Sequence, residues 1–146
     1  MSADLNRPEP DPDKAELDRL MGLFFSAFTN TDGPPHTEHV HEVFIPQGTI
    51  ISQTGDQTIV YDLDSFIAPR HRILTDGTLT EFAEWEVSEQ TEIYGSIAHR
   101  FSEYRKSGIQ NGEQFEGGGH KTTQFVRTPA GWRISSIAWE DDNPTT

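Results

Sequence analysis

The stretch TEIYGSIAHRFSEYRKSG, residues 91–108, alternates apolar or aromatic residues with polar ones over most of its length. A period of two is typical of a β-strand with one buried face. Three further stretches from residue 80 onward have the same character: TEFAEWEVSE (80–89), QFEGGGHKTTQFVRT (114–128) and GWRISSIAWED (131–141). We therefore expect four long strands separated by turn-like breaks, notably at Gly117-Gly118-Gly119 and at 128–131.

The part of the chain before residue 80 is predicted to be mainly helical. A helical stripe places apolar residues at i, i+3, i+4, i+7, i+8 and i+11, namely Leu17, Leu20, Met21, Phe24, Phe25 and Phe28. It predicts a helix over 13–30. Shorter helices are expected over 37–44 and over 68–76, where Pro69 suits the first helical position. The segments 44–52 and 57–62 are expected to be extended. Helices followed by a meander of strands indicate an α+β domain, with helices on one face of an antiparallel sheet.

Composition restricts the class of protein. The 146 residues favour a single domain, predicted over 13–142, between a flexible acidic segment (1–12) and a short tail (143–146). Eleven basic against twenty-four acidic residues give a net charge of −13, which argues against nucleic acid or an anionic membrane as partner. The chain has no cysteine, which excludes disulfides and thiolate chemistry. Without an apolar leader, we expect a cytoplasmic protein.

Three histidines, His36, His39 and His41, raise the possibility of a metal site. The spacing matches the start of a cupin pattern, which requires a glutamate four or five residues after the second histidine of the His-x-His pair. Ile45 and Pro46 occupy those positions and cannot coordinate a metal through their side chains. On a helix, His39 and His41 would point about 200° apart. We therefore predict no metal, and a cupin-like metalloenzyme ranks third among the functional hypotheses.

Four segments together resemble the nuclear transport factor 2-like superfamily, and more narrowly its SnoaL-like bacterial members. They are HEVFIPQGTII (41–51), DLDSFIAPRHRILTDG (62–77), IYGSIAHRFSEY (93–104) and KTTQFVRTPAGWRISSIAWEDD (121–142). The resemblance implies a cystatin-like cone, in which three helices close over a curved sheet around a pocket. It also implies a homodimer built through the sheet. Members include ketosteroid isomerases, dehydratases, polyketide cyclases and structural modules, so the resemblance predicts a fold more than an activity.

The ionisable group predicted to line the pocket is His99. It shares a row of alternate positions with Ile93, Gly95, Ile97 and Phe101, and the apolar character of that row assigns it to the helix-covered face. An inward histidine could act as a general base or acid. The alternative is a core histidine whose ring is satisfied by a neighbouring polar group.

Four further residues are predicted to contact a ligand: Tyr61, Trp85, Gln124 and Trp139. Tyr61 ends the short strand near the expected pocket mouth, and Trp85 belongs to an apolar row. Gln124 could orient a ligand, although Phe125 leaves the facing of its strand open. Trp139 shares a face with Trp132 only if a bulge near Ser135-Ser136 shifts the alternation. An ordinary core would explain the same aromatic residues.

The sequence leaves two main functional hypotheses. The first is a protein that binds a small apolar molecule bearing a polar group; as an enzyme it would be an isomerase or dehydratase that uses proton transfer without metal or organic cofactor. The second is a non-catalytic binding or dimerisation module. Arg70, His71 and Arg72 could attract a carboxylate ligand or could form a solvated helix face. Tyr94 and Tyr104, on the row opposite His99, are candidates for the homodimer interface.

Overall fold

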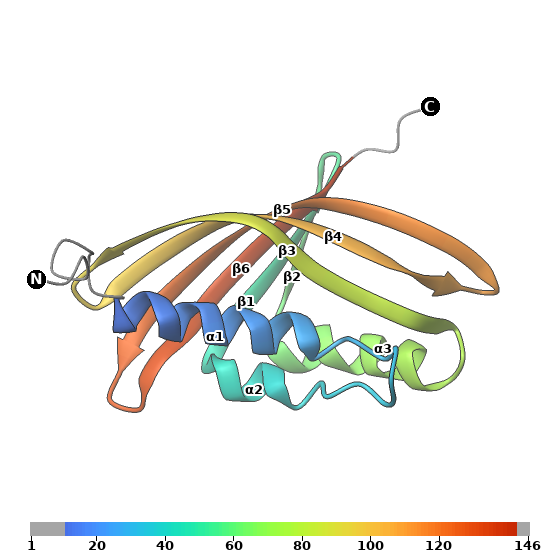
Figure 1. Cartoon of the computed structure of the whole chain (residues 1–146), viewed down its shortest axis with the longest axis horizontal. Helices are drawn as coiled ribbons and strands as arrows, with labels where there is room; N and C mark the ends of the chain where they lie inside the picture. The colour runs from blue at the N-terminus through green and yellow to red at the C-terminus, as the bar shows by residue number, and fades with distance from the viewer. Residues whose placement is uncertain (1–10, 143–146) are drawn as a thin grey trace, which may run out of the picture.

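The computed structural model describes residues 11–142 and consists of three helices beneath one curved sheet (Figure 1). The elements, in chain order, are α1 (Pro12–Ser26), α2 (His39–Val43), β1 (Phe44–Thr54), β2 (Gln57–Tyr61), α3 (Leu63–Thr75), β3 (Leu79–Tyr94), β4 (Ile97–Gln110), β5 (Glu113–Thr128) and β6 (Gly131–Asp141). The strands lie in the order β2-β1-β6-β5-β4-β3. The predicted α+β class is confirmed, but the sheet is mixed because β1 pairs with β6 in parallel.

Helix α1 lies against the concave side of the sheet through the predicted apolar stripe (Figure 1). Its start is fixed by Asp11, whose side chain accepts a hydrogen bond of 2.9 Å from the backbone N–H of Asp13, and by Pro12 at the first helical position. The helix ends at Ser26, earlier than predicted, and Phe28 beyond it still packs into the core.

Helix α3 begins at Leu63, five residues before the predicted start. Asp62 and Ser65 form a capping box: the Asp62 carboxylate accepts from the backbone N–H of Ser65 (2.7 Å), and the Ser65 hydroxyl accepts from the N–H of Asp62 (3.0 Å). Pro69 therefore lies inside the helix and not at its first position. Within residues 11–142, no helix is long and apolar enough to cross a lipid bilayer.

The predicted single strand through residues 93–104 is in fact a hairpin. Tyr94 pairs with Ile97 across a two-residue turn at Gly95-Ser96, where Gly95 has φ +58°. In an antiparallel pair, directly opposed residues share a face, so Ile93 lies on the same face as Ala98 and not as Ile97. The helix-covered row of β4 is consequently Ala98, Arg100, Ser102 and Tyr104, all buried, and the predicted row that included His99 is wrong.

The three glycines predicted to break a strand lie inside β5 instead. Gly118 and Gly119 are opposite Arg105 and Tyr104 of β4. A Cβ atom on Gly119 would lie 2.6 Å from the Tyr104 hydroxyl oxygen and 2.3 Å from the backbone oxygen of Glu140. The glycines therefore permit a close approach between β5, the Tyr104 side chain and β6, which is a packing role and not a turn.

Arg100 joins α1 to the sheet. Its side chain is 3% exposed and donates to Glu86 on β3 (2.6 and 3.1 Å) and to Asp18 on α1 (2.6 Å). Ser102 donates to the same Glu86 carboxylate at 2.6 Å. A buried guanidinium is tolerated only when its donors are satisfied by carboxylates in good geometry, so this network fixes how α1 sits on β3 and β4.

Replacing Arg100 with Met should lower the free energy of unfolding by about 3 kcal/mol, because Glu86 is left as a poorly solvated carboxylate without its partner. Urea denaturation measures the change. Arg105→Met, on the exposed row of the same strand, is the matched control and should change stability by less than about 0.5 kcal/mol. Equal effects of the two substitutions would contradict the role assigned to Arg100.

Candidate functional site

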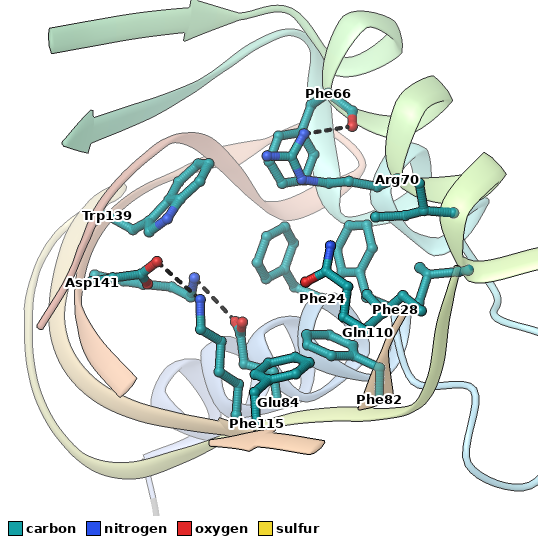
Figure 2. A pocket seen from close by; sticks show the side chains of 15 residues that line it. Phe24, Phe28, Phe66, Arg70, Phe82, Glu84, Gln110, Phe115, Trp139 and Asp141 are labelled. Carbon is teal, nitrogen blue, oxygen red and sulfur yellow. Dashed lines mark hydrogen bonds and ion pairs between the residues drawn. The ribbon is translucent and has the colours of Figure 1, made fainter. Parts of the chain in front are cut away.

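A cavity of about 270 Å³ lies between α1, α3 and the concave face of β3 to β6. Figure 2 shows side chains from both helices and from the strands converging on it. Aromatic rings make most of the apolar wall: Phe24, Phe28, Phe66, Phe82, Phe115 and Trp139. A concave, aromatic-lined space with a few polar groups is typical of a small-molecule site.

Two ion pairs form the polar part of the wall on the sheet side. The Nζ of Lys121 lies 3.1 Å from a carboxylate oxygen of Glu84, and the Nζ of Lys106 lies 2.9 Å from Asp141 (Figure 2). Lys121 is buried and its ammonium lies 4.2 Å from the centroid of the Tyr104 ring. Both carboxylates that line the cavity are therefore already neutralised by lysines.

The hydroxyl of Tyr104 donates a hydrogen bond to Asp141. Burial, and next this contact with a carboxylate, raise the pKa of Tyr104 well above its ordinary value, so the phenol stays protonated. Burial alone would raise the pKa of Asp141, but the hydrogen bonds from Tyr104 and Lys106 more than offset it and hold that pKa below its ordinary value. At neutral pH, the pair is a neutral donor bound to a fixed negative charge.

Arg70 extends from α3 over the ring of Phe66, with its guanidinium carbon 3.9 Å from the ring centroid (Figure 2). The rings of Tyr61 and Trp139 lie at 5.1 and 5.7 Å from the same atom. Its Nη1 donates to the backbone oxygen of Phe66 at 3.1 Å. Within residues 11–142, Arg70 forms no ion pair with a carboxylate. Of the cluster Arg70, His71 and Arg72, Arg70 alone lines the cavity.

Two of the predicted ligand contacts, Trp139 on β6 and Tyr61 on β2, lie at the cavity or next to it. A register shift leaves Ser135 unpaired between Gln124 and Phe125 of β5, which confirms the expected bulge and turns Trp139 inward. Trp139 lines the cavity. Tyr61 does not line it but packs behind it, stacked on Trp139 with ring centroids 6.5 Å apart. Both residues thus belong to one aromatic wall.

The other predicted site residues face away. His99 lies on the outer face of the sheet, 54% exposed at its side chain, with Nε2 2.6 Å from a carboxylate oxygen of Glu92. Gln124 is its cross-strand partner and is exposed on that same face. Trp85, which is 46% exposed, lies opposite Arg105 on the edge strand β3. The predictions for His99, Gln124 and Trp85 placed these side chains on the wrong face. For His99, the error came from continuing the alternation of the preceding strand through the two-residue turn at Gly95-Ser96.

Glu84, Lys121 and Asp141 were not predicted, although the sequence carries a signal for one of them. Lys121 is on the same parity as Thr123 and Phe125, and the structure buries that whole row. Taking Phe125 as the inward residue of β5 would have predicted Lys121 in the interior as well. Glu84 carries no comparable signal, because it alternates with the apolar residues Ala83 and Trp85, which simple alternation assigns to the interior. Asp141 carries none because it lies between two exposed acidic residues, Glu140 and Asp142.

The three clustered histidines do not converge. His36 and His39 stack, with ring centroids 5.4 Å apart, while Nε2 of His41 lies 3.2 Å from Asp64. In the part of the chain that the structure describes, no three histidine, aspartate or glutamate side chains are grouped as metal ligands would be. The absence of a bound metal stays a prediction.

No protein-family model matches the chain, and no curated protein matches it. Solved structures do. A protein from Kribbella flavida superposes with a TM-score of 0.73 at 19% identity, over 90% of this chain and 91% of its own. A nuclear transport factor 2-like superfamily protein from Salmonella enterica gives 0.72 at 14% identity, over 91% and 93%. A protein with a cystatin-like fold from Caulobacter vibrioides gives 0.69 at 15% identity, over 92% of each chain.

This chain has the nuclear transport factor 2-like fold. At these identities, the likeness concerns the fold and not the activity. The nuclear transport factor 2-like cone accounts for the position of the cavity, which lies between the concave sheet and α1 and α3. The narrower resemblance to SnoaL-like proteins stays a prediction.

Replacing Tyr104 with Phe should lower the free energy of unfolding at pH 7 by about 1–2 kcal/mol, because Asp141 loses a buried donor. The native pKa of Asp141 lies below that of the unfolded chain, so its contribution is present above that unfolded value and is lost as pH falls through the native one. The difference between wild type and variant should therefore shrink in acid. Urea denaturation at pH 7 and at about pH 3 tests this.

The matched control is Tyr61→Phe, which removes a hydroxyl that makes no hydrogen bond within residues 11–142 and should change stability by less than about 0.5 kcal/mol, with no change in its pH dependence. An undiminished difference between Tyr104→Phe and wild type in acid would contradict the coupling to Asp141.

Proposed function

We propose that the protein binds a small, largely apolar molecule bearing a polar group in the cavity between α3 and the sheet. The observation that carries this proposal is the cavity itself: the core leaves a space of about 270 Å³ that the surrounding aromatic side chains do not fill. The space is partly open to solvent, so a ligand could enter it, and a concave, aromatic-lined pocket with a few polar groups favours a ligand over a purely structural cone.

The chemistry of the wall defines the class of ligand. Six aromatic rings supply an apolar contact surface, and Arg70, Gln110 and the two lysine–carboxylate pairs supply polar groups at limited positions. Pockets for drug-sized ligands span roughly 300–1,000 Å³. The cavity lies just below that range, which favours a compact molecule with one ring over a sterol-sized one.

Proton-transfer catalysis of the isomerase or dehydratase type is the second candidate, and Glu84 beside Lys121 is the observation that favours it. A general base must reach the proton that it abstracts, and His99 on the outer face cannot reach the cavity. Glu84 lines the cavity at its sheet side and is only partly exposed. Any such chemistry would use Glu84 as base and the Lys121 ammonium to stabilise developing negative charge.

Filling the cavity should weaken binding. Gln110 is exposed at the end of β4 and its side chain points into the cavity (Figure 2), so Gln110→Trp should block the space without disturbing the buried core. Probe compounds with one ring and one polar group, such as indole, phenol and cinnamamide, should lose affinity by about tenfold or more in this variant. Ligand-observed NMR and calorimetry measure the affinities.

Gln124→Trp makes the same exchange on the outer face and is the control, for which binding should be unchanged. Equal binding of the probes by wild type and Gln110→Trp would place them elsewhere on the protein and would refute the cavity as the site.

We also propose that the protein forms a homodimer through the outer face of the sheet. Tyr94, Ile97 and Phe101 are 84%, 59% and 51% exposed, and their register places them together on that face. Exposed apolar groups that gather on one surface are typical of an interaction site. Tyr104, the other predicted interface residue, is buried under the helices and takes no part.

Phe101→Glu should therefore shift the protein toward a monomer at micromolar concentration, because the interface would have to bury an unpaired carboxylate. Sedimentation velocity measures the mass. Ile59→Glu is the control, since Ile59 is an exposed apolar residue whose partner Ser52 lies on the helix-covered face. A wild-type protein that sediments as a monomer would refute the homodimer.

A further inference from the structure

The five ionisable side chains that line the cavity do not balance in charge. Arg70, Lys106 and Lys121 are cationic, and Glu84 and Asp141 are anionic. Each carboxylate is paired with a lysine at about hydrogen-bond distance, 3.1 Å for Glu84 with Lys121 and 2.9 Å for Asp141 with Lys106. One positive charge, that of Arg70, therefore remains in a chain whose net charge is −13.

The guanidinium of Arg70 is held in place but its donors are largely unused. The rings of Phe66, Tyr61 and Trp139 surround it, and the backbone oxygen of Phe66 takes a hydrogen bond from Nη1. It makes no other hydrogen bond or ion pair with residues 11–142. Arginine presents five N–H donors in a rigid fork that matches a carboxylate in two parallel hydrogen bonds. Aromatic surroundings strengthen such a contact by excluding water.

We infer that Arg70 recognises a carboxylate, and that the ligand of the proposed site is a small aryl or cyclic monocarboxylic acid. This rests on the proposed function, because it names the polar group of the molecule that the cavity takes. The ring of the acid lies among Phe24, Phe28 and Trp139, and its carboxylate meets the guanidinium on the α3 side of the cavity. A monoanion completes the charge balance of the wall, whereas a phosphate group, which carries about −1.5 to −2 at pH 7, would leave an excess of about half to one negative charge.

Arg100 shows the contrast within the same chain. Its guanidinium, also beneath the sheet, is satisfied by Glu86 and Asp18. The fold thus provides carboxylate partners where an arginine is structural, and it provides none to Arg70 within the described residues. The arrangement around Arg70 is that of a site completed from outside the chain.

The test compares matched acids and amides: benzoate with benzamide, phenylacetate with phenylacetamide, and cinnamate with cinnamamide. Wild-type protein should bind each acid at least tenfold more tightly than its amide by calorimetry or ligand-observed NMR. Arg70→Gln should remove that preference while leaving the affinity for the amides within about twofold. Arg70→Lys, which keeps the charge but loses the fork, should retain part of it.

Arg72→Gln is the matched control, because it removes an exposed arginine two positions along the same helix and should keep the wild-type preference. Circular dichroism and thermal unfolding check that each variant is folded. Binding of the amides with no gain for the acids, or a preference that survives in Arg70→Gln, would overturn this inference and leave the proposed function in place. No binding of either series by the wild-type protein would overturn both.

Discussion

The structure depends on the contact between the buried guanidinium of Arg100 and the carboxylates of Glu86 and Asp18. Asp18 belongs to α1 and Glu86 to β3, so this contact sets the distance and angle at which the first helix crosses the sheet. The same helix carries Phe24, which forms part of the cavity wall, with Phe28 just beyond its end. The polar anchor is thus near the middle of the helix, and the cavity lies beside its C-terminal end.

The interior of this cone therefore contains charged and polar side chains as well as apolar ones. Arg100, Ser102 and Lys121 lie under the helices on rows that an entirely apolar core would fill with valine or isoleucine. Each is satisfied: Arg100 and Ser102 by Glu86, and Lys121 by Glu84 and the face of Tyr104. Apolar side chains of β4 lie instead on the outer face, where Ile97 and Phe101 are exposed. The buried face of β4 therefore carries charged and polar side chains and its outer face carries apolar ones, the reverse of what simple alternation predicts.

This exchange explains which features could be predicted from the sequence. The stripe of α1 and the bulge at Ser135 were predicted correctly, because each follows from local periodicity among strongly apolar residues. His99 was assigned to the wrong face for two reasons. The turn at Gly95-Ser96 reverses the relation between the rows before and after it, and the buried row is polar because its charges are paired by residues distant in sequence.

Arg70 illustrates a second limit on prediction. Its sequence neighbours suggested a basic helix face, and the predicted helix over 68–76 left out Phe66, one of the buried residues that show which of Arg70, His71 and Arg72 points toward the sheet. Successive side chains of a helix differ in direction by about 100°, so Arg70, four residues after the buried Phe66 and four before the buried Leu74, shares their face, whereas His71 and Arg72 are exposed. Long-range placement of Trp139 and Phe66 around the guanidinium then completes a site that no local pattern describes.

The parallel pairing of β1 with β6 governs the order in which the molecule can be assembled. Phe44 is opposite Ile134, 90 positions later, and β6 lies between β1 and β5 in the sheet. The helices with β1 and β2 form one sequence-local unit, and the meander of β3, β4 and β5 forms another, and only β6 joins their strands into one sheet. Closing so long a loop is entropically costly and slows folding relative to local hairpins. Trp139 and Asp141 are on β6 and Arg70 is on α3, which follows β2, so we expect the cavity wall to be complete only when β6 has paired with both β5 and β1.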